Sequence, residues 1–118
     1  MAKKRMVVQF GQGHSIRRKD YTAAAERAVR DALWHNSLTV AEAFGFPKQA
    51  MIIEVEIGVQ QPDLVDIKQI LKVFPYGTPS IRVVHGGLDM PKPHREGINI
   101  IANAAVIVSF DMEEVVHA

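Results

Sequence analysis

The sequence predicts an α+β fold, a two-layer sandwich in which two helices cover one face of a four-stranded mixed sheet. Apolar runs of strand length occur four times, and two other segments carry apolar residues at helical spacing. These segments follow the order strand-helix-strand-helix-strand-strand. The chain of 118 residues, 47% hydrophobic and 23% charged, has the size and composition of a single globular domain spanning residues 1–118.

The first strand and the first helix lie in the N-terminal third of the chain. Met6–Gly11 is apolar and β-branched and ends in the turn-prone Gly11-Gln12-Gly13. Asp20 is typical of a helix N-cap, because its carboxylate can accept hydrogen bonds from the free amides of the first turn. We therefore expect a helix from Tyr21 to about His35. Its apolar stripe consists of Ala25, Ala28, Val29, Ala32 and Leu33.

The remaining elements follow a less clear segment with a helical turn around Thr39–Ala43. Met51–Gln60 alternates apolar and polar residues, which indicates a half-buried strand. Asp63 and Asp66 should open a second helix, whose apolar stripe consists of Ile67, Ile70, Leu71 and Phe74. Ser80–His85 and Ile98–Phe110 are the last two strands. We expect a right-handed parallel first crossover and an antiparallel pairing of the last two strands.

One face of this sheet has no predicted cover. Two helices cannot cover both sides of a four-stranded sheet, and the strand Ile98–Phe110 is apolar on both of its sides. Large exposed apolar patches are rare on monomers. The sequence therefore predicts a homo-oligomer in which a second subunit covers this face.

Composition excludes several classes of function. The chain contains no cysteine, so disulfides, thiolate metal sites and thiol nucleophiles are excluded. Its net charge of +1 argues against a general nucleic-acid-binding protein. No apolar stretch approaches the ~20 residues needed to cross a membrane, and no secretory signal is visible. We expect a cytoplasmic protein with no membrane partner, no metal and no cofactor.

The loop between the first strand and the first helix, residues 11–20, is the candidate binding site. Gly11 and Gly13 permit close backbone approach, and the helix start supplies free amides. Three successive cations, Arg17, Arg18 and Lys19, would add positive charge. Together these features predict a site for a carboxylate or a phosphate. The alternative is a solvated basic loop, since the motif matches neither a Walker loop nor a dinucleotide-binding fingerprint.

Two residues of this loop are candidate catalytic groups. His14 could act as a general acid or base, and Ser15 as a nucleophile if a base reaches it. Neighbouring residues of an extended chain point to opposite sides, so the pair needs a bent loop in order to cooperate. The alternative for each is a surface polar residue.

Two further residues are candidate ligand contacts. His85 ends the third strand, and parallel strands would place it at the same sheet edge as His14, where open α/β sheets bind ligands. Asn103 lies among apolar neighbours and needs a hydrogen-bond partner if it is buried. Glu54 and Glu56 share one strand face, which is more typical of a solvated surface or an intersubunit ion pair than of a metal site.

The chain resembles a small family of uncharacterised proteins from bacteria and plants. The resemblance rests on Gly11-x-Gly13, Arg27–Ala32, Val73–Gly77, Val83–Leu88 and Asn103–Val106. The family signature Gly-x-Gly-x-Asp-x-His-Gly is kept at both glycines, but here Ser15, Arg17 and Arg18 stand at the Asp, the His and the last Gly. The resemblance implies a shared fold and a shared site location, and it implies no activity.

Two hypotheses follow from the sequence. The first is an oligomeric enzyme or binding protein for a small anionic molecule, with a hydrolytic reaction conceivable if Ser15 finds a base. The second is a non-catalytic homo-oligomeric protein whose basic loop forms an interface. Whether the protein is an enzyme is left open by the sequence.

Overall fold

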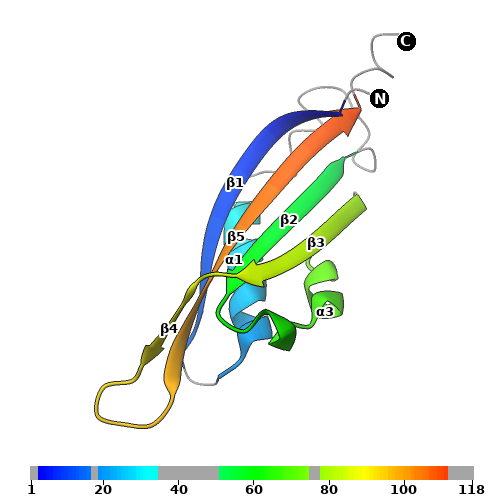
Figure 1. The fold of residues 1–118 in the computed structure, drawn as a ribbon. Helices are drawn as coiled ribbons and strands as arrows, with labels where there is room; N and C mark the ends of the chain where they lie inside the picture. The colour runs from blue at the N-terminus through cyan, green and yellow to red at the C-terminus, as the bar shows by residue number, and fades with distance from the viewer. Residues whose placement is uncertain (1–2, 17–18, 35–50, 75–77, 112–118) are drawn as a thin grey trace.

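The computed structural model describes residues 3–16, 19–34, 51–74 and 78–111, which form an α+β structure with a five-stranded mixed sheet (Figure 1). The expected turn at Thr39–Ala43 lies outside the described residues. The elements are β1 (Lys3–Ser15), α1 (Tyr21–Trp34), β2 (Ile52–Val59), the 3-10 turn η3 (Pro62–Leu64), α3 (Ile67–Leu71), β3 (Thr78–His85), β4 (Leu88–Pro91) and β5 (Ile98–Asp111).

The longest strand, β5, occupies the centre of the sheet. The strand order is β1-β5-β2-β3, and β5 is antiparallel to β1, β2 and β4. β2 and β3 are parallel, which the long connection between them allows. The expected pairing of β5 with β3 is wrong, because β5 lies between β1 and β2 instead. A strand that is apolar on both sides is best buried in the middle of a sheet, and β3 takes an edge.

The sheet has five strands rather than the expected four. β4 forms between the two last predicted strands, where the sequence predicts no element, and it pairs with β5 from Leu88↔Ile101 to Pro91↔Ile98. Gly87, with φ +63°, allows the chain to turn from β3 into β4, and a Cβ there would lie 2.2 Å from the Ile101 carbonyl oxygen. The Gln60 side chain holds this crossing by donating to the Gly86 carbonyl at 3.0 Å.

The helix α1 lies almost directly on the backbone of β1. A Cβ on Gly11 would lie 2.2 Å from the Ala28 carbonyl oxygen, and one on Gly13 would lie 2.3 Å from the Ala24 carbonyl oxygen. Ala24, Ala28 and Ala32 are fully buried at this contact. The expected loop from Gly11 to Ser15 is therefore part of β1, because these glycines serve close packing of a helix on a strand.

The N-terminus of α1 has the cap that the sequence predicted. The Asp20 carboxylate accepts a hydrogen bond from the Ala23 amide at 2.9 Å. At α3, Asp66 likewise accepts from the Lys68 amide at 3.0 Å. The second helix, α3, ends at Leu71 and is shorter than predicted. Of its predicted apolar stripe, Ile70 and Phe74 are buried, whereas Ile67 and Leu71 are both 39% exposed.

Both helices lie on one side of the sheet (Figure 1). α1 packs on β1, β5 and β2, and α3 packs beside α1 and β3. Alternation in β2 follows the prediction, since Ile53, Val55, Ile57 and Val59 are buried under the helices. We call the opposite side the open face. Its described members on the two longest strands are Val8, Phe10, Gln12 and His14 of β1, and Ile101, Asn103, Ala105 and Ile107 of β5.

Candidate functional site

The two candidate catalytic residues lie on opposite sides of β1. His14 is exposed on the open face, and Ser15 is buried on the helix side with 3% exposure. The bend that would have brought them together does not occur, because β1 stays paired with β5 as far as Ser15↔Ile100. The geometry of a strand thus separates a general base at His14 from a nucleophile at Ser15.

The cations of the predicted site are only partly described. Arg17 and Arg18 lie outside the described residues, whereas Lys19 is exposed just before α1. Gly11 and Gly13 face the backbone of α1, which leaves no room there for an anion. The two glycines of the predicted site therefore face a helix, and the anion-binding role of its cations stays a prediction.

His85 and Asn103 do not come together. β1, β2 and β3 all run in the same direction, as the prediction required. The register nevertheless places His85 opposite Val59, whose side chain is buried under the helices. Asn103 is exposed on the open face, opposite Gln12 and Gly58.

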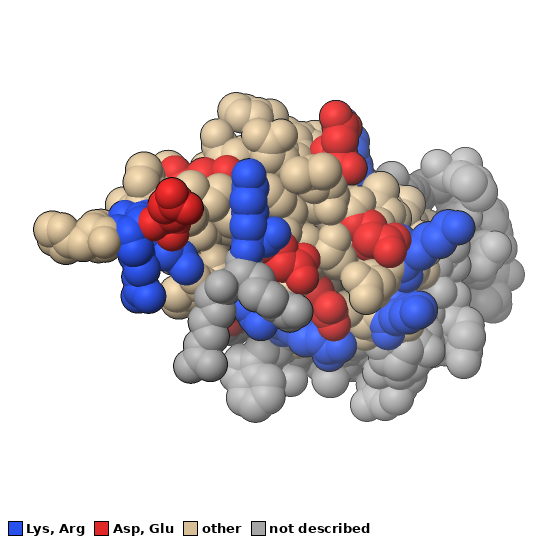
Figure 2. All heavy atoms as spheres, turned by 90° about the horizontal axis from the view of Figure 1, so that it is seen from below, with Lys and Arg blue, Asp and Glu red and all other residues tan. Residues whose placement is uncertain are grey.

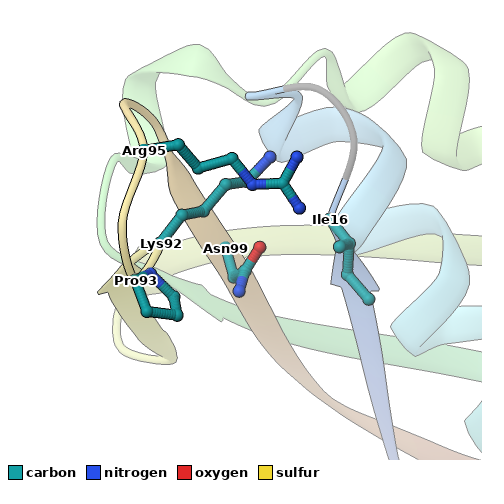
Figure 3. Close-up of a pocket in the computed structure, with 5 residues that line it drawn as sticks. All are labelled: Ile16, Lys92, Pro93, Arg95 and Asn99. Atoms are coloured by element: carbon teal, nitrogen blue, oxygen red, sulfur yellow. The ribbon is translucent and has the colours of Figure 1, made fainter.

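A cavity of about 470 Å³ lies where the hairpin between β4 and β5 meets the end of β1 (Figure 3). Its lining residues are Ile16, Lys92, Pro93, Arg95 and Asn99. We call this the hairpin pocket. Lys92 and Arg95 extend from the hairpin toward the space above Asn99, and Ile16 forms the opposite wall (Figure 3). Within the described part of the chain, neither cation forms an ion pair.

The amide of Asn99 is unsatisfied in this pocket. Its Oδ1 atom is shielded from solvent and accepts no hydrogen bond. A shielded carbonyl oxygen without a donor costs about 1–3 kcal/mol. Because this oxygen is shielded, a bound group can donate to it only after the Asn99 side chain turns toward the cavity. The pocket therefore combines two cations with a neighbouring amide oxygen that lacks a donor.

A hydrogen bond fixes the hairpin to the start of α1. The hydroxyl of Tyr21, which is 2% exposed, donates to Oδ2 of Asp89 on β4. Burial, followed by the hydrogen bond and the negative charge of Asp89, raises the pKa of Tyr21 to about 12. The other carboxylate oxygen of Asp89 is buried and lacks a partner. Because Asp89 lies on the strand that leads to Lys92, this bond positions the cations of the hairpin pocket.

Charges of both signs share the surface at this end of the molecule. Figure 2, which views the molecule from below, shows Lys and Arg atoms interspersed with Asp and Glu atoms. Glu54 and Glu56 lie away from the pocket, along a shallow groove of the open face, and Glu56 forms an ion pair with Arg82 at 2.9 Å. In the described ranges, no three His, Asp or Glu side chains gather as a metal site would require.

Sequence reasoning missed three residues of the hairpin pocket. Lys92 and Arg95 lie before the predicted strand Ile98–Phe110, where the sequence predicts no element, and Asn99 lies inside that strand. The usable signal was the turn-prone composition of the segment, with Pro91, Pro93 and Gly97 around the two cations. Their approach to Ile16 depends on β4, β5 and β1 being neighbours, which the local sequence does not reveal.

The comparisons with known proteins bear on the fold more than on the chemistry. The family model Lin0512, described as a conserved hypothetical protein, matches residues 5–108. A solved structure from Nostoc punctiforme PCC 73102, described as an FtsZ-like protein of unknown function, is 35% identical with a TM-score of 0.83. The match covers 94% of this chain and 98% of that chain. No curated protein gave a match. The resemblance to an uncharacterised family is confirmed at that level.

Among the helices that the structure describes, none is both long and apolar enough to span a membrane.

Proposed function

The chain belongs to the Lin0512 family of conserved hypothetical proteins, and from this premise we propose that it binds a small anion in the hairpin pocket. The observation that carries the proposal is the pair of unpaired cations, Lys92 and Arg95, at a cavity of about 470 Å³. A carboxylate or phosphate is the class of group that two such cations bind. The proposed function is binding rather than hydrolysis, because His14 and Ser15 lie on opposite sides of β1.

The vacant acceptor of Asn99 narrows the class of ligand. Hydrogen phosphate and hydroxycarboxylates carry both negative charge and an O–H donor, whereas sulfate carries no donor near neutral pH. Once the Asn99 side chain turns toward the cavity, an anion with a donor can satisfy its Oδ1 atom while the charged oxygens of the anion contact Lys92 and Arg95. We therefore expect phosphate to bind more tightly than sulfate.

Isothermal titration calorimetry with phosphate and with sulfate tests the proposal. Arg95→Gln should weaken phosphate binding at least ~10-fold, because a charge-assisted hydrogen bond contributes roughly 1.5–3 kcal/mol. Lys68→Gln is the matched control, since Lys68 is exposed on α3 away from the pocket. Equal affinities of the wild type and the Arg95 variant would refute the proposal.

The same titration addresses the basic loop. If Arg17→Gln abolishes phosphate binding while Arg95→Gln leaves it intact, the site is the loop of residues 11–20 that the sequence predicted, and the hairpin pocket is not the site. Loss of binding in the Arg95 variant alone supports the pocket. Asn99→Leu should remove the preference for phosphate over sulfate, because the apolar side chain has no acceptor.

A further inference from the structure

The middle of the open face is uncharged on β1 and β5. The pairs from Val8↔Ile107 to His14↔Ile101 include no Asp, Glu, Lys or Arg. The charges of this face lie beside them on β2, where Glu54 and Glu56 neighbour Ile107 and Ala105. Phe10 is 71% exposed at the middle of this surface. β4 extends the apolar surface with Leu88, 48% exposed, and Met90, 49% exposed. Depletion of charge together with exposed aromatic and Met side chains is typical of the core of a protein interface.

The edge of β1 is less available than the face. The Gln12 amide donates to the carboxylate of Asp31 at 2.9 Å, and the His14 carbonyl accepts a hydrogen bond from Arg27. Both Asp31 and Arg27 belong to α1, so the helix occupies the hydrogen-bonding groups that an added strand would need. A partner at this part of the sheet must therefore contact the face.

The size of the open face matches what a stable interface needs. β5 has 14 residues, which span roughly 46 Å at ~3.3 Å per residue. The face is three strands wide along most of β5, which has β1 on one side and β2 or β4 on the other. Three strands at a spacing of ~4.8 Å span about 14 Å, so the flat area of the face is about 650 Å² before the protruding side chains are counted. Standard interfaces bury about 800 Å² per partner.

The relief of the face suits a second copy of the same surface. Phe10 protrudes, while its cross-strand neighbour Ala105 is small. The space over Gly58, farther along β2, is filled by the chain itself, because a Cβ there would lie 3.3 Å from the Gly86 Cα atom. A protrusion and a recess on one face can interlock when two copies pack symmetrically. We propose that a second copy of this chain docks face to face on the open face, with Phe10 of each copy packed against Ala105 of the other.

Sedimentation equilibrium between about 1 and 200 µM measures the assembly of the wild type and of two matched variants. Phe10→Asp should raise the dissociation constant of the assembly about 100-fold or more, because a charge would be buried at the centre of the contact. Leu64→Asp is the control, since Leu64 is 59% exposed on η3, on the helix side of the sheet. Far-UV circular dichroism checks that each variant is folded.

Three results would overturn the proposal. If the wild-type protein stays monomeric at 200 µM, a second copy does not bind to the open face. Assembly lost in Leu64→Asp but kept in Phe10→Asp transfers the interface to η3 and α3. Equal masses of the wild type and Phe10→Asp show that the open face is not the contact. If Phe10→Asp does not fold, Leu88→Lys on β4 replaces it with the same expectation.

Discussion

The two sides of the sheet differ in how closely other parts of the chain pack on them. On the helix side, the backbones of α1 and β1 approach so closely that two glycines and three buried alanines are needed. On the open face, side chains such as Phe10 and Leu88 project outward with no layer above them in the described chain. The difference shows that the helix side holds the fold together, while the open face and the hairpin beside it are available for contacts with other molecules.

The largest expected effect is at the helix-side glycines. Gly13→Ala should destabilise the fold by about 3 kcal/mol or more, because the new Cβ would lie 2.3 Å from two backbone atoms of α1, which cannot yield as a side chain can. Urea unfolding measures the loss. Gln12→Ala, one residue away on the open face, should change stability by less than about 0.5 kcal/mol. Equal losses of stability in Gly13→Ala and Gln12→Ala would contradict the view that the helix side holds the fold together more than the open face does.

Tyr21→Phe should cost about 2 kcal/mol in the free energy of unfolding. The substitution removes the hydrogen bond to Asp89 and leaves both carboxylate oxygens of Asp89 without a partner among the described residues. Phosphate affinity should fall as well, because the hairpin loses its attachment to α1. An unchanged midpoint in thermal unfolding would show that the bond contributes nothing.

High pH should weaken the same attachment. The folded-state pKa of Tyr21 is raised to about 12 from 10.0, so the stabilisation is complete below pH 10 and is lost as the pH rises toward 12. The loss should be on the order of 2 kcal/mol. Unfolding of wild type and Tyr21→Phe across this range measures it, since the variant lacks the titrating hydroxyl. Parallel pH profiles of the two proteins would contradict the expectation.

The smallest expected effect is on the open face. Arg82→Gln should lower stability by no more than about 0.5 kcal/mol, because the side chains of Arg82 and Glu56 are 72% and 44% exposed and water screens their ion pair. Thermal unfolding at low and high salt checks this. A loss of more than about 2 kcal/mol in the free energy of unfolding of the monomer would show that this ion pair on the open face stabilises the fold.

The sequence predicted the elements whose signals are local. The helix at Tyr21, its cap at Asp20 and the alternation of β2 depend on neighbouring residues, and each is present in the structure. β4 was missed because a strand of four residues ending in Pro91 forms only where β5 is already in place. The position of β5 in the sheet was missed for a related reason, since pairing partners depend on the arrangement of the whole chain.

In the candidate site, too, the features that the sequence missed depend on residues that are distant in the chain. A sequence motif cannot reveal whether Gly11 and Gly13 face a ligand or a helix, because the deciding atoms belong to Ala24 and Ala28. Lys92 and Arg95 become a pair around Asn99 only after β4 and β5 form a hairpin beside Ile16. The roles of His14, Ser15, Arg17, Arg18, Lys19, His85 and Asn103 as ligand or catalytic contacts remain predictions.

By itself, the sequence determined the α+β class, the direction of the first three strands, the caps of both helices and the excess of apolar residues on β5. Those properties follow from periodicity and from hydrogen bonds over a few residues. Only the tertiary structure decided the strand order, the glycine contact beneath α1, the separation of His14 from Ser15 and the hairpin pocket. Each of these depends on atoms that are distant in the chain and meet only when the sheet has formed.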